Sequence, residues 1–190
     1  MDIPKIFTIS ESAHRIHNPF TAQKYATLGQ VLRMAPGTRI LDLGSGSGEM
    51  LCTWARDHGI TGIGIDMSQL FTEQAKRRAG ELGVGDQVTF IHGDAAGYVS
   101  AEKVGVAACV GATWIGGGVA GTIELLARSL RPGGIILIGE PYWRRLPATN
   151  EVARACGASS IADFLTLPDL VASFDRQGYD LVEMVLADRK

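Results

Sequence analysis

The stretch "RILDLGSGSGEM", residues 39–50, decides the fold of this chain. Its apolar start meets three glycines spaced two apart, Gly44, Gly46 and Gly48, and a helix-compatible stretch, "EMLCTWARDHG" (49–59), follows directly. A strand that turns tightly into a helix needs positive φ angles and close backbone approach, which glycine alone provides at little cost. The stretch therefore predicts a strand, a loop and a helix, with a ligand lying against the bare loop. A tight turn without a ligand is the structural alternative.

Four further apolar runs alternate with stretches of helical periodicity. Each run is apolar almost without interruption, which is typical of strands covered on both faces. Strand and helix in regular alternation predict an α/β fold, a doubly wound, mostly parallel, Rossmann-like sheet with helices on both faces. Ligands of such sheets bind at the carboxyl ends of the strands, so we expect the site just after each strand. The four runs are "TGIGI" (61–65), "QVTFIH" (87–92), "VGVAACV" (104–110) and "GIILIGE" (134–140).

Three segments lie outside this alternation. At the front, Thr21 can cap a helix, and we assign residues 1–35 to an N-terminal helical cap. Residues 141–167 form a long insertion with two short helical stretches, which is typical of a lid at the ligand edge. After a last helix, "YDLVEMVLA" (179–187) is predicted to be a sixth strand. We expect all of these in a single domain, residues 1–190.

Composition argues against several classes of partner. The chain carries 18 Lys and Arg residues and 20 Asp and Glu residues, for a net charge of −2, and no basic tract is longer than "KRR". A nucleic-acid partner usually leaves a basic footprint, so none is expected. The three cysteines lie far apart, without the paired spacing of a zinc site or a disulfide framework. They predict a reducing compartment, and hence a cytoplasmic location.

One uncharged run, residues 104–121, is long enough to be considered as a membrane span. Six of its 18 residues are glycines, which weaken a helix. We therefore favour a buried strand followed by a glycine-rich loop, with no membrane partner, and keep the span as the alternative.

Acidic residues follow the second and third apolar runs. Asp66 ends "GIGID", where its carboxylate can accept hydrogen bonds from both hydroxyls of a ribose. Asp66 can also cap the next helix together with Ser68. In "HGDAAG", Asp94 can accept from the exocyclic amine of an adenine while Gly93 and Ala95 leave room for the ring, or it can cap a short helix that follows. Loop and acids together imply a ligand of adenosine type.

Taken together and in order, "LDLGSGSG", "GIDMS", "HGDA" and "LRPGG" resemble the class I S-adenosylmethionine-dependent methyltransferases. The resemblance covers roughly residues 20 to 187 and extends to small bacterial members with an N-terminal "HRIHNPF" stretch. It implies that Asp42 and the glycine loop hold the methionine end of S-adenosyl-L-methionine, that Asp66 binds the ribose, and that Met67 flanks the adenine. The implied cofactor-binding set is Asp42, Gly44, Ser45, Gly46, Gly48, Asp66, Met67, Gly93, Asp94 and Ala95, and the expected product is S-adenosyl-L-homocysteine.

The spacing of the loop favours a ligand without phosphate. A dinucleotide loop reads GxGxxG and binds pyrophosphate at a helix N-terminus. Here the third glycine, Gly48, comes one residue early, and Asp42 stands just before the loop. A carboxylate there suits a cationic amino group better than a phosphate.

Aromatic residues are the candidates for binding a methyl acceptor. Trp114, Tyr142 and Trp143 follow the fourth and fifth runs, and Tyr25 lies in the N-terminal helix. Aromatic rings can face a sulfonium through cation–π contact and can enclose an apolar substrate. Core packing or lid closure is the structural alternative for the first three.

Three residues are candidates for a general base, His14, His17 and Glu140. The two histidines lie three apart in "HRIH", but a metal pair needs at least a third ligand and none is evident, so no metal is expected. Surface or packing histidines are the alternative. Glu140 ends the fifth run, where it could orient a substrate or accept a proton.

We therefore expect methyl transfer to a small-molecule acceptor by in-line displacement. A nicotinamide-dependent oxidoreductase and a non-catalytic cofactor-binding protein that results from C-terminal shortening are the alternatives. The resemblance also implies a seventh strand inserted in the sheet, for which the sequence offers no segment after residue 187. An incomplete sheet edge could be completed by a second copy, so a homo-oligomer is expected.

Overall fold

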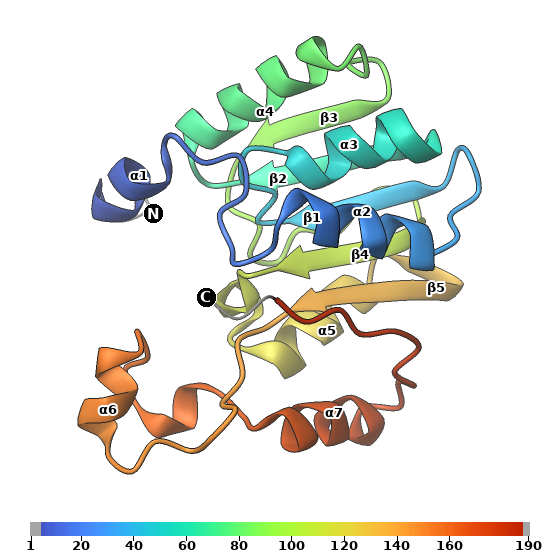
Figure 1. The fold of residues 1–190 in the computed structure, drawn as a ribbon. Helices are drawn as coiled ribbons and strands as arrows, with labels where there is room; N and C mark the ends of the chain where they lie inside the picture. Colours follow the sequence, from blue (N-terminus) through green and yellow to red (C-terminus); the bar gives the residue numbers. More distant parts are fainter. Residues whose placement is uncertain (1–4, 188–190) are drawn as a thin grey trace. The chain divides into compact units, whose positions relative to one another are not determined.

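A computed structural model describes residues 5–187 (Figure 1). The chain divides into two compact units, Met1–Gly139 with Val185–Lys190, and Glu140–Met184. The first contains the glycine loop and all five apolar runs.

The first unit is built on a five-stranded sheet in which all neighbouring strands are parallel. The strand order, β3-β2-β1-β4-β5, reverses direction between β1 and β4. This arrangement confirms the predicted α/β fold and places a strand at each apolar run. The strands are β1 (Arg39–Leu43), β2 (Thr61–Asp66), β3 (Val88–His92), β4 (Val104–Val110) and β5 (Leu130–Gly139).

Helices cover both faces of this sheet, as predicted. In Figure 1, α2, α3 and α4 lie on one face and α5 on the other. Strand side chains alternate between faces, so Ile40 of β1 packs in the cluster under α2 and α3, whereas Leu41 and Leu43 pack in the cluster that includes α5. Two buried faces explain why the strands are apolar throughout. The helices of this unit are α1 (Lys5–Glu11), α2 (Ala22–Val31), α3 (Glu49–His58), α4 (Gln69–Glu81), the 3₁₀ helix η1 (Thr113–Gly116) and α5 (Val119–Ala127).

The helix predicted after Thr21 begins where its sequence predicts. Thr21 caps α2, and its hydroxyl accepts a hydrogen bond from Lys24 N at 3.3 Å. α2 buries the side chains of Tyr25 and Leu28 in the apolar cluster that it shares with α3 and the sheet. The N-cap residue Thr21 therefore fixes where this helix begins and where the chain enters the first unit's core.

The second unit contains three short helices around a small apolar core. They are α6 (Asn150–Ala155), the 3₁₀ helix η2 (Ile161–Asp163) and α7 (Leu167–Arg176). Trp143 lies in this core with Ala153 and Ala158. The insertion predicted at residues 141–167 falls within this unit, and its role as a lid stays a prediction.

The prediction of a sixth strand at residues 179–187 is wrong. Beyond β5, the residues described up to 187 form no strand. Alternating apolar side chains make a strand only when the backbone N–H and C=O groups pair with a neighbouring strand. Here four apolar side chains are exposed instead, Val182 at 72% with Leu181, Met184 and Leu186, while Val185 is partly buried against the first unit's core.

The uncharged run at residues 104–121 is not a helix that spans a membrane. It forms β4, a loop, η1 and the start of α5. Among residues 5–187, no helix is long and apolar enough to cross a bilayer.

Candidate functional site

A cleft opens at the carboxyl ends of the strands in the first unit. It contains about 880 Å³ of empty space, part of it open to solvent. Its walls come from the loop after β1, the ends of β2 and β4, the turn after β3, and the segment Arg15–Asn18 between α1 and α2. This is the edge where open parallel sheets bind ligands, and β1 and β4 are the strands at which the strand order reverses.

The three glycines of the loop have different roles, two in the cleft wall and one in packing. Gly44 and Gly46 line the cleft with φ angles of 76° and 53°. A Cβ on Gly46 would lie 3.0 Å from the ring of His17. Gly48 is not part of the cleft wall. A Cβ there would lie 2.6 Å from Phe90, so this glycine lets α3 pack closely on the sheet.

Asp66 braces the loop from the end of β2. Its Oδ2 accepts a hydrogen bond from Gly46 N and its Oδ1 accepts one from Ser68 N, both at 2.8 Å. Ser68, not Asp66, is the N-cap of α4. Each carboxylate oxygen keeps a second acceptor position, so the side chain, which also lines the cleft, can still bind a ligand hydroxyl.

Asp42 is a buried carboxylate in the cleft wall. The residue is 4% exposed, and no donor among residues 5–187 hydrogen-bonds its carboxylate. Burial, reinforced by the nearby charge of Asp66, raises the pKa of Asp42 to about 7. A buried carboxylate without a partner is costly, and a cationic donor on a ligand would relieve that cost.

The turn after β3 brings two more predicted residues to the cleft. Asp94 and Ala95 line it, together with Met67 from the end of β2. The Oδ1 atom of Asp94 accepts from Ala96 N at 2.8 Å, which closes a turn. The alternative in which Asp94 caps a helix is wrong because no helix follows. Gly93 lies outside the cleft wall, and no atom stands within 4 Å of a Cβ built on it.

Of the two histidines in "HRIH", only His17 lines the cleft. Its Nε2 lies 3.0 Å from the carbonyl oxygen of His14 and 3.1 Å from Ser47 Oγ. Because a carbonyl only accepts, we assign the proton to Nε2, which leaves Nδ1 as an acceptor in the neutral ring. Burial lowers the pKa of His17, which favours that neutral form. The exposed His14 side chain instead pairs with Glu11 at 3.0 Å.

Two predicted aromatic residues lie in the cleft wall, Tyr25 and Trp114. The Tyr25 hydroxyl accepts a hydrogen bond from Asn18 Nδ2 at 2.7 Å, and burial raises the pKa of this phenol well above its usual range. Trp114 lies on η1 and is 59% exposed. An exposed indole at the wall of a cleft provides stacking surface for a ligand.

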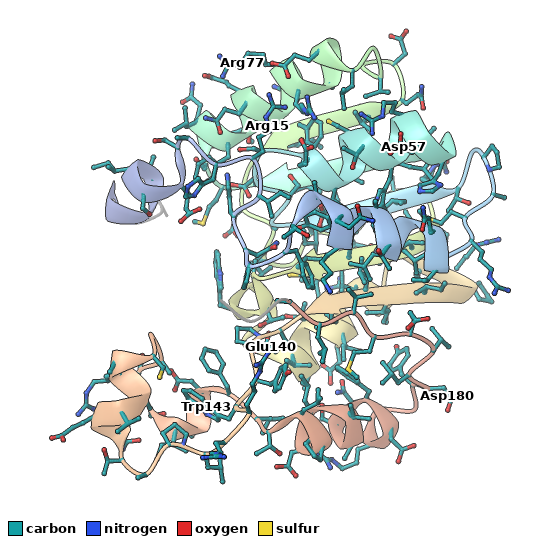
Figure 2. The ribbon with its side chains drawn as sticks, viewed as in Figure 1. Arg15, Asp57, Arg77, Glu140, Trp143 and Asp180 are labelled. Atoms are coloured by element: carbon teal, nitrogen blue, oxygen red, sulfur yellow. The ribbon has the colours of Figure 1, made fainter. Side chains whose placement is uncertain are left out.

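The remaining three candidates belong to the second unit. Figure 2 labels Glu140 and Trp143 there. Trp143 packs against Phe164 with ring centroids 5.3 Å apart, and its Nε1–H donates to Ile161 O at 2.8 Å. Core packing, the structural alternative for Trp143, is therefore what this unit shows. The acceptor-binding role of Tyr142 stays a prediction.

Several residues of the cleft wall could not be predicted from the sequence. Four come from the "HRIHNPF" stretch or the glycine loop, segments that the sequence singled out without assigning these side chains. The others are apolar or acidic residues that carry no motif. The set comprises Arg15, Ile16, Asn18, Ser47, Glu49, Met50, Phe71, Val110, Gly111, Ala112 and Ile115. Within the described part of the chain, no cluster of three His, Cys, Asp or Glu side chains could hold a metal ion.

Comparison with known proteins places this architecture in a family. A family model described as "Methyltransferase domain" matches residues 40–134, which is half of the chain. "Uncharacterized protein YjhP" of Escherichia coli (strain K12) is 78% identical over 190 residues, covering 100% of this chain and 77% of that protein.

Two solved structures extend the match. One is a SAM-dependent methyltransferase from Geobacter sulfurreducens in complex with S-adenosyl-L-homocysteine. It superposes with a TM-score of 0.97 at 79% identity, over 98% of this chain and 75% of that one. The other is a SAM-dependent methyltransferase from Thiobacillus denitrificans in complex with the same compound. Its TM-score is 0.96 at 75% identity, over 99% of this chain and 76% of that one.

Proposed function

Because the chain belongs to the class I S-adenosylmethionine-dependent methyltransferases, we propose that its cleft binds S-adenosyl-L-methionine for methyl transfer to a small-molecule acceptor. Buried Asp42 is the observation that supports this most strongly, because its carboxylate lacks a protein donor and suits the cationic amino group of the cofactor's methionine end. Relatives crystallised with S-adenosyl-L-homocysteine support the same ligand.

The charge of the cleft opposes the dinucleotide alternative. Its described lining contains the carboxylates of Asp42, Glu49, Asp66 and Asp94, and Arg15 is the one Lys or Arg among those residues. A pyrophosphate would meet like charge at close range, which is unfavourable in a partly buried site. The excess of acidic over basic side chains in the lining also supports a small molecule over a nucleic acid as acceptor, because contacts to phosphates depend on Lys and Arg side chains.

Each end of the cofactor has a matching part of the wall. Asp42 would accept from the amino group, Asp66 from the ribose hydroxyls and Asp94 from the adenine amine, while Met67 would pack on the ring. When bound, the cofactor supplies a methyl group that is already activated on a sulfonium. The protein is left to align the acceptor, the methyl carbon and the sulfur in line and to exclude water.

The acceptor would lie against the apolar part of the wall, formed by Ile16, Val110, Trp114 and Ile115. A general base is needed only when the acceptor must lose a proton. His17 is then the candidate that the cleft geometry supports, because its Nδ1 is the unprotonated nitrogen of a neutral ring.

Calorimetric titration with S-adenosyl-L-homocysteine and, separately, with NAD tests the cofactor. We expect micromolar affinity for the first and no detectable binding of NAD. Asp66→Ala should weaken binding at least about tenfold, because it removes a ligand acceptor and leaves the N–H of Gly46 without its partner. Asp57→Ala is the control. Asp57 lies in the last turn of α3 (Figure 2), and it pairs with Arg56. NAD binding alone would overturn the proposal.

Two further expectations concern the protein's surroundings. β5 is an edge strand of the five-stranded sheet, which supports association with a second copy. Size-exclusion chromatography with light scattering tests this, and a monomer would contradict it. Cys52 and Cys109 are buried cysteines that form no disulfide, which supports a reducing, cytoplasmic location. If the protein binds the cofactor tightly but methylates none of the acceptors tested, the non-catalytic alternative would be favoured.

A further inference from the structure

Residues Ser12–Asn18, which we name the strap, run past the glycine loop. In Figure 1 the strap is the blue trace between α1 and α2, and it passes the carboxyl ends of the strands. Four of its residues, Arg15–Asn18, line the cleft. The strap contains no helix or strand, so its position depends on side-chain contacts.

A chain of hydrogen bonds fastens the strap to the glycine loop and α4. Gln74 Nε2 donates to Ser12 O at 2.8 Å, and Gln74 Oε1 accepts from Ser47 Oγ at 2.6 Å. Because Ser47 gives its one proton to Gln74, its oxygen accepts from His17 Nε2–H at 3.1 Å. The same N–H reaches His14 O at 3.0 Å. This series of hydrogen bonds thus begins and ends on backbone carbonyls of the strap, those of Ser12 and His14.

Packing supports the same attachment. The His17 ring lies against Phe71 of α4, with centroids 4.1 Å apart. Arg15, labelled in Figure 2, pairs with Glu81 of α4 at 3.5 Å. The His17 ring also stands over Gly46, where even a Cβ would be crowded. The strap therefore forms part of the cleft wall directly over the loop.

The other end of the strap is anchored separately. Asn18 Oδ1 accepts from Phe20 N at 3.1 Å, and Asn18 Nδ2 donates to Tyr25 OH at 2.7 Å. These bonds tie the end of the strap to α2. Breaking the chain of bonds at Gln74 and His17 would free the middle of the strap while this anchor stays in place.

We propose that the strap is a gate over the cofactor loop, latched by Gln74 and His17, which must open for the cofactor to enter and its product to leave. His17 and Gln74 act here as positioning residues. The inference rests on the proposed function, because the molecule that passes the gate is the cofactor.

Stopped-flow binding of S-adenosyl-L-homocysteine tests the gate, with tryptophan fluorescence as the signal because Trp114 lines the cleft. Gln74→Ala removes the latch, and His17→Phe keeps a ring against Phe71 but removes the hydrogen bonds. In both variants we expect the association and dissociation rate constants to rise together, by about fivefold to tenfold, which corresponds to the loss of one hydrogen bond.

A matched control lies on the same helix. Gln69→Ala removes an exposed side chain that bonds Glu73 at 2.8 Å, and both rate constants should stay at the wild-type values. Faster dissociation with unchanged association in the latch variants would show that these residues only contact the cofactor, and would overturn the gate. Unchanged rates in both would also overturn it. A wild-type protein that binds no S-adenosyl-L-homocysteine would overturn the proposed function and the gate with it.

Discussion

Replacing Asp42 by Asn should make the protein more stable and its cofactor affinity weaker. The substitution keeps the shape of the side chain and removes its ability to ionise. In the fold, burial raises the pKa of Asp42 from the ordinary 3.8 to about 7. Above that pH the protein holds a buried carboxylate whose partner, in our proposal, is the amino group of the ligand.

The size of the stability effect follows from this difference in pKa. Between 3.8 and about 7, the unfolded chain has lost a proton that the folded chain still holds, so raising the pH destabilises the fold. At 1.36 kcal/mol per pKa unit, the full effect is about 4 kcal/mol in the free energy of unfolding, reached once Asp42 is ionised in both states. Asp42→Asn shows no such loss of stability at any pH, because its amide does not ionise.

Urea unfolding of both proteins at about pH 5 and about pH 8 measures this difference, without ligand. We expect the stability of Asp42→Asn relative to wild type to increase between the two conditions by a few kcal/mol. Calorimetry should show the opposite trend in binding. Wild-type affinity for S-adenosyl-L-homocysteine should fall as the pH drops below about 7, and the variant should bind at least about tenfold more weakly at about pH 8. A stability difference that does not change with pH would refute the reasoning.

Two other substitutions separate packing from binding. Gly48→Ala should lower the free energy of unfolding by about 2–4 kcal/mol, because its φ of +72° disfavours a side chain and the new Cβ would lie 2.6 Å from Phe90. Gly37→Ala, with φ +79° and no atom within 4 Å, should cost only about 1 kcal/mol in the same urea experiment, and equal losses would contradict a packing role for Gly48. Trp114→Ala should leave affinity for S-adenosyl-L-homocysteine within about threefold while lowering turnover of an identified acceptor at least about tenfold. A parallel loss of affinity would assign Trp114 to the cofactor instead.

The strands and the edge that carries the cleft could be predicted from the sequence because their signals are local. An uninterrupted apolar run requires two covered faces, and a glycine loop directly after it requires a turn into a helix. Parallel strands then bring the residues after each run to one edge. Asp42, Asp66 and Asp94 could be placed at that edge without knowledge of any contact between them.

The sixth strand shows where local signals fail. Residues 179–187 have the alternation of a strand, but a strand exists only when another backbone pairs with it, and nothing in the segment itself specifies that partner. The packing contact of Gly48 could not be predicted for a similar reason. Its spacing matches the other loop glycines, while its contact with Phe90 comes from a strand far along the chain.

By itself, the sequence determined the order of the five strands and the helices between them, the family, and the edge of the sheet that carries the cleft, because each depends on residue type and spacing along the chain. Only the tertiary structure decided how these side chains act on one another. It left Asp42 buried without a donor, turned His17 over Gly46, and joined Ser12 to Ser47 through Gln74. Burial and hydrogen bonding depend on neighbours that are distant in the chain, and only the folded molecule brings those neighbours together.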